Sequence, residues 1–124
     1  MINNNFTDIN LSFGSKKTFK RVFDRCAYSG EPFSQCDAPT IEHIIPVNCG
    51  GPDSFSNYLV VSHSWNSDRK DTPLGEYIRE NPCVKENIIK AVNSQNGKVI
   101  EGINWAQEVK KTLLQAIGYD IFKK

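Results

Sequence analysis

The sequence predicts an α+β fold in which a two-stranded hairpin and the helix that follows it form a small centre. Two short runs of apolar and β-branched residues, 40–47 and 58–63, have the length and composition of strands. A segment rich in Gly, Pro, Asp, Ser and Asn, residues 48–57, joins the two runs, and after residue 63 the apolar residues change to helical spacing. Loops of this length in compact domains usually carry function.

The chain length fits one domain. It has 124 residues, of which 39% are hydrophobic and 23% charged. We therefore expect a single domain over residues 1–124, with a basic helix (15–25), the hairpin and its helix (40–71) and a helical C-terminal part (72–124). No run of 18 apolar residues is present, and the N-terminus lacks the pattern of a secretory signal. We expect a cytoplasmic protein with no membrane partner.

Residues 15–25, SKKTFKRVFDR, concentrate positive charge although the formal net charge of the chain is only +1. Phe19, Val22 and Phe23 have the spacing of one apolar helical face, so we expect a short helix with its other face basic. That face could contact phosphates, or it could simply be solvated. Its candidate contacts are Lys16, Lys17, Lys20 and Arg21.

The C-terminal part, residues 72–124, predicts helices that form the core. Thr72-Pro73 and Asn81-Pro82 each indicate a helix start, since proline is tolerated at the first helical position. Asn104 is the expected cap of the last helix. Apolar residues recur in one stripe on each of the last two helices and predict buried faces: Val84, Ile88, Ile89 and Val92, then Ala106, Val109, Leu113, Ala116 and Ile117.

Polar residues suited to hydrolysis gather around the predicted hairpin. Glu42 and His43 lie on the first strand, Asn57 closes the loop, and Asn66 lies on the first turn of the next helix. Antiparallel pairing with the helix folded back would bring them together. Glu42 and Asn66 offer two oxygen ligands to a hard cation such as Mg²⁺ or Mn²⁺. His43 remains free to take a proton from water near neutral pH, and metal plus base is the equipment for phosphodiester hydrolysis.

Residues 41–71, IEHIIPVNCGGPDSFSNYLVVSHSWNSDRKD, resemble the HNH nuclease motif, the ββα-metal or His-Me finger site of many phage, homing, toxin and CRISPR effector nucleases. The intervals match the H-N-N subtype, and the resemblance covers about residues 26–71. The matching elements, in order, are Glu42-His43, Ile44-Ile45-Pro46, Gly50-Gly51, Asn57-Tyr58-Leu59, Asn66 and Arg69-Lys70.

The resemblance implies a role for each polar residue of the motif. His43 would be the general base that activates water for in-line attack. Glu42 and Asn66 would hold one Mg²⁺ or Mn²⁺, and Asn57 would pin the loop and orient His43. The implied enzyme is a metal-dependent HNH endonuclease that hydrolyses DNA phosphodiester bonds.

The resemblance also implies the substrate. Arg69 or Lys70 would contact phosphate, with the basic helix as a further contact that carries affinity without sequence information. We expect double-stranded rather than single-stranded DNA. One site cuts one strand, so a monomer would nick, and a double-strand break would need a homodimer or a second event. A stand-alone HNH protein this short is typical of a phage or a mobile element.

The chain departs from the family pattern at two places. The family usually has Asp where Glu42 stands, so the metal geometry must adjust. Many relatives bind a structural zinc through two C-x-x-C pairs, whereas the matching positions here are Cys26, Ser29, Ser62 and Trp65. One thiolate cannot make a tetrahedral zinc site. We expect no structural zinc, with Trp65 and nearby aromatic side chains packed into that space.

Other interpretations stay open. The departures would also fit a catalytically weak or inactive HNH-fold protein that binds nucleic acid or protein, although the intact set of His43, Asn57 and Asn66 argues against it. Taken singly, His43 could be a core histidine, Asn57 an Asx-turn and Asn66 a helix cap. A toxin-type nuclease would come with a larger chain and an immunity partner, and the sequence indicates neither.

Overall fold

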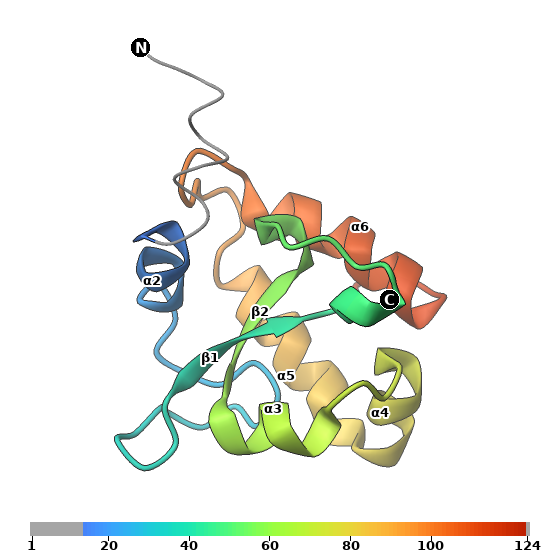
Figure 1. Cartoon of the computed structure of the whole chain (residues 1–124). Coiled ribbons are helices and arrows are strands. Elements are labelled where there is room, and N and C mark those ends of the chain that lie inside the picture. The colour runs from blue at the N-terminus through green and yellow to red at the C-terminus, as the bar shows by residue number, and fades with distance from the viewer. Residues whose placement is uncertain (1–13, 124) are drawn as a thin grey trace.

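The fold is α+β, as predicted. The computed structural model describes residues 14–123, in which strands β1 (Pro39–His43) and β2 (Tyr58–Ser62) form a two-stranded antiparallel sheet. The register sets Glu42 opposite Leu59 and His43 opposite Tyr58. Figure 1 shows α2 to the left of this hairpin, α3 and α4 below it, α5 behind it and α6 at the upper right. The helices are α2 (Gly14–Lys20), α3 (His63–Arg69), α4 (Leu74–Glu80), α5 (Pro82–Asn93) and α6 (Trp105–Ile117), with 3₁₀ turns η1 (Val47–Cys49) and η2 (Phe55–Asn57) between the strands.

Strand β1 is shorter than the predicted strand 40–47, because the hairpin ladder stops at His43. The backbone of Ile45 is hydrogen-bonded by the Asn57 side chain instead of a strand. The Asn57 Oδ1 accepts from Ile45 N at 2.9 Å, and its Nδ2 donates to Ile45 O at 2.9 Å. Pro46, which follows, has no N–H to continue a ladder. His43 therefore stands at the end of a strand, beside an irregular loop.

The basic helix is also shorter than predicted. α2 ends at Lys20, and the backbone N–H groups of Arg21 and Val22 donate to Thr18 and Phe19 in a closing turn. Phe19 is fully buried, stacked on Phe55 with ring centroids 5.0 Å apart. Val22 is 37% exposed because the helix ends before it. The predicted apolar face of three residues is therefore wrong at Val22.

The helical C-terminal half follows the predicted starts closely. α5 begins with Pro82 at its first position, and the Asn104 side chain caps α6 by accepting from Gln107 N at 3.2 Å. The stripes of both helices face inward: Val84, Ile88, Val92, Ala106, Val109 and Leu113 are buried, and Ile89, Ala116 and Ile117 are half-buried. None of the described helices is long and apolar enough to cross a membrane.

The hairpin is anchored to this helical core through β2. Every residue of β2 is buried, and the Trp105 indole on α6 donates to Tyr58 O at 3.0 Å. Burial of a large apolar side chain stabilises a fold by roughly 1.5–3 kcal/mol, so this packing holds β2 firmly. β1, α2 and α3 are assembled on that support, since both helices contact β1.

Candidate active site

A cleft of about 320 Å³ opens where β1 meets α3. Glu42 and His43 line it from the end of β1, and Asn66 lines it from α3. Three of the four residues singled out in the motif therefore share one surface. Three exposed polar residues also line the cleft: Asn48, Lys70 and Asp71.

Glu42 enters the cleft as a buried carboxylate, 4% exposed. Its Oε2 accepts from the Tyr28 hydroxyl at 2.7 Å and from Arg69 Nη1 at 3.2 Å. Burial raises the pKa of Glu42 above its ordinary value, while the Arg69 guanidinium and the Tyr28 hydroxyl oppose that rise. Oε1 accepts no hydrogen bond from any described residue, so one carboxylate oxygen is fixed and the other is available.

Asn66 is arranged in the same way. Its Nδ2 donates to Thr40 Oγ1 at 3.0 Å and to Ile41 O at 3.2 Å. Because a backbone carbonyl can only accept, this contact fixes which end of the amide faces β1. The opposite atom, Oδ1, has no hydrogen-bond partner among residues 14–123.

These two free oxygens are of the type that Mg²⁺ and Mn²⁺ prefer. Within the described part of the chain, no group of three or more His, Cys, Asp or Glu residues could hold a metal ion. A site built on Glu42 and Asn66 alone would depend on water and phosphate oxygens for its other ligands, as Mg²⁺ sites commonly do. The donor chemistry fits such a cation.

His43 has an acidic partner that was not predicted from the sequence. Its Nε2 lies 2.9 Å from Asp53 Oδ1, and its ring meets the Tyr58 ring edge-on with centroids 5.4 Å apart. Asp53 also accepts from the Tyr58 hydroxyl at 2.5 Å and from Lys16 Nζ at 2.9 Å. Hydrogen bonds from Tyr58, His43 and Lys16 hold the pKa of Asp53 well below its ordinary value. The one available signal was that Asp53 is the only acid in segment 48–57.

Asn57 is fully buried and holds the loop between the strands. Besides its two bonds to Ile45, its Nδ2 donates to Pro52 O at 2.9 Å. Its backbone carbonyl accepts from Ile44 N at 2.9 Å. No hydrogen bond joins it to His43 directly, so it acts on the histidine through the backbone that follows β1.

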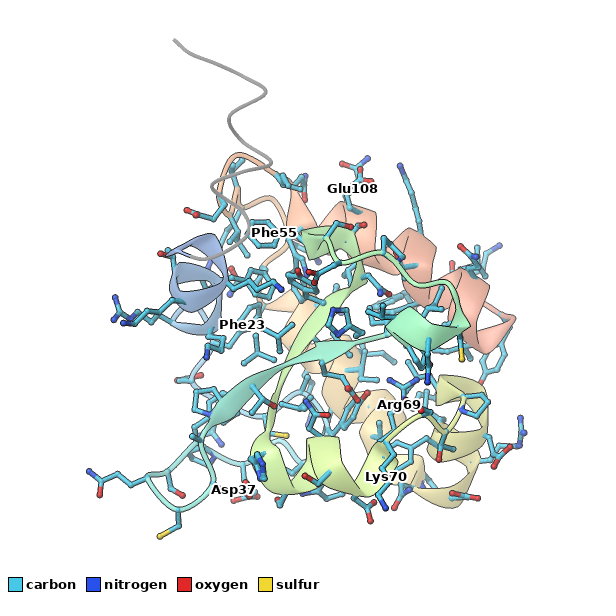
Figure 2. The ribbon with its side chains drawn as sticks, viewed as in Figure 1. Phe23, Asp37, Phe55, Arg69, Lys70 and Glu108 are labelled. Carbon is cyan, nitrogen blue, oxygen red and sulfur yellow. The ribbon has the colours of Figure 1, made fainter. Side chains whose placement is uncertain are left out.

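Arg69 is too deeply buried to contact a phosphate, so the predicted phosphate contact is wrong for this residue. The side chain is 1% exposed and points from α3 into the interior, whereas Lys70 lies at the surface (Figure 2). The Arg69 guanidinium donates to Glu42 and to the backbone carbonyls of His43 at 2.9 Å and Ile44 at 2.8 Å. Burial lowers the pKa of the Arg69 guanidinium, and the neighbouring Tyr28 and Glu42 outweigh that effect and raise it above its ordinary value. Arg69 therefore supports the cleft from behind.

The remaining basic residues are spread over two places. Lys70 lines the cleft, and Lys16 reaches its edge through Asp53. Lys17 and Arg21 are exposed and Lys20 is half-buried, at the surface of α2 and of the turn that follows it. Of these five residues, Lys16 is the one with an acidic partner beside the histidine.

Three of the four positions that match the zinc ligands of HNH nucleases, Cys26, Ser29 and Ser62, lie together. Cys26 Sγ accepts from Ser29 N at 3.4 Å and from Ser62 N and Oγ at 3.3 and 3.5 Å. Burial raises the pKa of this thiol, and the hydrogen bonds from the two serines outweigh that effect and lower it. Trp65 packs edge-on against Tyr77, with centroids 6.5 Å apart. One sulfur cannot supply the ligands of a tetrahedral zinc site.

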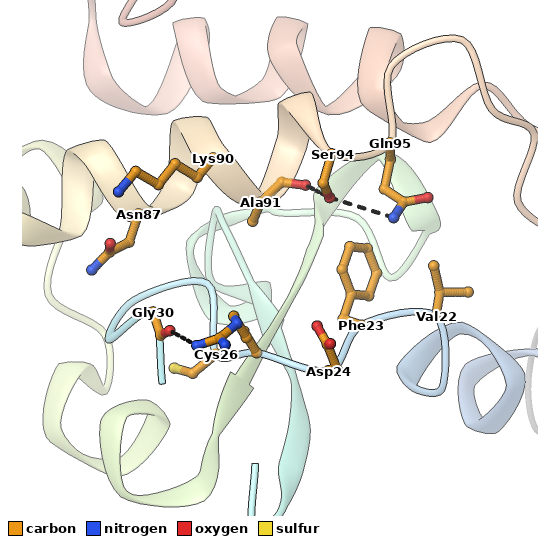
Figure 3. A pocket seen from close by; sticks show the side chains of 11 residues that line it. Val22, Phe23, Asp24, Cys26, Gly30, Asn87, Lys90, Ala91, Ser94 and Gln95 are labelled. Carbon is orange, nitrogen blue, oxygen red and sulfur yellow. Dashed lines mark hydrogen bonds between the residues drawn. The ribbon is translucent and has the colours of Figure 1, made fainter. Parts of the chain in front are cut away.

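A second cavity, of about 360 Å³, lies between α5 and the chain around residues 22–30 (Figure 3). Its lining mixes apolar groups such as Phe23 with the polar side chains of Asp24, Asn87 and Lys90. It shares no residue with the cleft at β1, and none of the residues predicted for the active site lines it.

Comparison with known proteins bears on the same segment. Residues 26–74 match the family model of the HNH endonuclease. The matched segment contains both strands, the loop between them, α3 and every lining residue of the cleft. No curated protein and no solved structure matches the chain.

Proposed function

Residues 26–74 belong to the HNH endonuclease family, and on this premise we propose that the protein is a metal-dependent endonuclease that hydrolyses DNA phosphodiester bonds with His43 as general base. HNH nucleases act on nucleic acids and generally use a divalent metal. The base, the metal ligands and DNA as the substrate are what we propose in addition.

One observation carries the proposal. Glu42 and Asn66 line the same cleft as His43, and each keeps one side-chain oxygen free of hydrogen bonds to described residues while its other polar atom is anchored. A binding module would have no need to hold these two oxygens beside a histidine. Anchored ligands cost little reorganisation when a cation or a transition state arrives.

Each residue has a task in the proposed reaction. His43 accepts the proton of the attacking water. Oε1 of Glu42 and Oδ1 of Asn66 would hold one Mg²⁺ or Mn²⁺, which would supply positive charge to offset that of the scissile phosphate. Arg69 favours the ionised form of Glu42 and holds its carboxylate in place, and Asn57 keeps the loop folded around the site. A single cleft cuts one strand, so the proposed product from a monomer is nicked duplex DNA.

The test is nicking of supercoiled plasmid by the purified protein with Mg²⁺, Mn²⁺ or EDTA. We expect relaxed circles that require metal and a His43→Ala variant slower by about 10²–10⁴-fold, the usual contribution of a general base. His63→Ala is the matched control, because His63 is exposed at the start of α3 and does not line the cleft. Cleavage that survives in His43→Ala would refute the assignment of the base. A folded protein that cuts neither plasmid, single strands nor RNA would favour the binding-module alternative.

A further inference from the structure

Asp53, which contacts His43, has no task in the reaction proposed above. We infer that Asp53 is the positioning residue of His43: its carboxylate accepts the Nε2 proton of the ring and leaves Nδ1 as the nitrogen that receives a proton from water. The inference rests on the proposed nuclease function, since it names the atom of the base that acts.

The carboxylate of Asp53 is held by three elements. His43 Nε2 at the end of β1 lies 2.9 Å from Oδ1, and the Tyr58 hydroxyl on β2 donates to the same oxygen. Lys16 Nζ on α2 donates to the other oxygen, Oδ2, at 2.9 Å. The Asp53 side chain is 54% exposed, and contact with water would leave its orientation free. The three partners, each from a different element, fix that orientation.

The chemistry of the partners fixes the direction of the bond to His43. An ionised carboxylate has no proton to give, so in this contact the ring must donate from Nε2. A neutral imidazole carries one proton, and Nδ1 is then the unprotonated nitrogen. No described residue donates to Nδ1. Carboxylate pairing of this kind selects one tautomer and holds the ring plane.

Lys16 makes Asp53 compatible with a polyanionic substrate. A bare carboxylate beside the cleft would repel an approaching phosphate, and the ion pair at 2.9 Å balances that charge. This pairing also gives Lys16 a different task from its exposed neighbours on α2. It joins the basic helix to the histidine through one acidic side chain.

The direct test is the ring signal of His43 in ¹⁵N NMR spectra, because ring ¹⁵N shifts distinguish the two neutral tautomers. The chain has two histidines, so exposed His63 serves as the internal reference. In Asp53→Asn the amide oxygen should turn to Lys16, which can only donate, and the NH₂ should turn to His43. We expect His43 to change from the Nε2–H to the Nδ1–H tautomer in this variant. In Asp53→Ala we expect loss of the low-field, hydrogen-bonded Nε2–H proton resonance, with His63 unchanged in both.

Activity supplies a second, independent readout. We expect kcat of both variants to fall by about 100-fold, the usual effect of misplacing a reacting group by a small distance. KM should stay the same or fall, because removal of a negative charge does not weaken binding of a polyanion. Asp24→Asn removes an exposed carboxylate outside the cleft and is the charge-matched control, with kcat and KM unchanged. The hairpin amide resonances report whether each variant is folded.

The outcomes separate this inference from the proposed function. His43 ring signals that are the same in the wild type and both variants would refute the inference, whatever the activity. An Asp53→Asn variant with the changed tautomer and full kcat would also refute it. The expected tautomer change in a wild-type protein that cuts no nucleic acid would uphold the contact and refute the nuclease assignment instead.

Discussion

At the scale of single residues, the site depends on buried polar side chains whose partners hold the cleft residues in place. Arg69 shows this most clearly. It contacts Glu42 and Tyr28 through their side chains, and its Nε also donates to Thr72 O at 2.8 Å. It thereby ties the end of α3 to the carboxylate and to the backbone that follows β1. Its loss would leave Glu42 as an uncompensated buried charge.

Replacement of Arg69 by Met should therefore destabilise the fold strongly. Removing one partner of a buried ion pair costs about 3–5 kcal/mol, because the remaining charge stays desolvated. The measurement is the free energy of unfolding by urea denaturation. Lys70→Met, next in sequence but exposed, is the control and should change stability by less than about 0.5 kcal/mol. A double variant Glu42→Gln/Arg69→Met should recover part of the loss, since it removes the stranded charge.

Equal, small effects of Arg69→Met and Lys70→Met would contradict the structural role of Arg69. They would return it to the phosphate-contact role that the sequence suggested.

The sequence located the residues that form the cleft but not the partners that hold them. Glu42, His43 and Asn66 could be found because their intervals follow from one hairpin and one helix. Arg69 was placed at the surface because arginine is almost never fully buried unless it is paired. Its partner Tyr28 lies 41 positions away in sequence, and a contact at that distance follows from packing and not from a local pattern.

At the scale of elements, the loop after β1 decides where the strand ends and the cleft begins. The sequence predicted a strand to residue 47 because residues 44–47 are mostly apolar. Apolar composition does not show that the Asn57 side chain forms the hydrogen bonds of the Ile45 backbone in place of a partner strand. It predicted the helix starts at Pro82 and Asn104 correctly because these depend on local backbone chemistry. Boundaries set by tertiary contacts were therefore missed, and boundaries set by local rules were found.

The two glycines of this loop have different reasons to be glycine. A Cβ on Gly51 would lie 1.8 Å from Ile45 O, inside the space that the backbone occupies. Gly50 has a left-handed φ of +92°, and a Cβ at this position would meet no atom within 4 Å. Gly51 is therefore required by contact and Gly50 by backbone conformation.

Substitution of each glycine by Ala should separate these causes. Gly50→Ala should cost about 1–2 kcal/mol of unfolding free energy, the usual cost of a left-handed residue with a side chain. Gly51→Ala should cost about 3 kcal/mol, the upper end of the usual cost of overpacking, because the Ile45 backbone cannot move away without breaking its two hydrogen bonds to the Asn57 side chain. Thermal unfolding measures both. If Gly50→Ala were the more damaging variant, the close approach of Gly51 to Ile45 would be wrong.

At the scale of the whole molecule, charge is nearly balanced, with a formal net charge of +1. Affinity for a nucleic acid must then come from where the cations lie. α2 presents Lys17 and Lys20 on the helix that also carries Lys16 to the edge of the site. α6 carries Lys110 and Lys111, whose ammonium groups already contact Asn96 and Glu108.

The salt dependence of DNA binding should distinguish these two surfaces. Each phosphate contact contributes about 0.9 to the slope of log K against log salt concentration on duplex DNA. Lys17→Gln/Lys20→Gln should therefore lower that slope by about 2 in fluorescence anisotropy titrations of a labelled duplex, with His43→Ala as the background to prevent cleavage. The charge-matched Lys110→Gln/Lys111→Gln variant should leave the slope unchanged. A slope that falls only in the α6 variant would place the duplex across the C-terminal helices, and α2 would then serve the site through Lys16 alone.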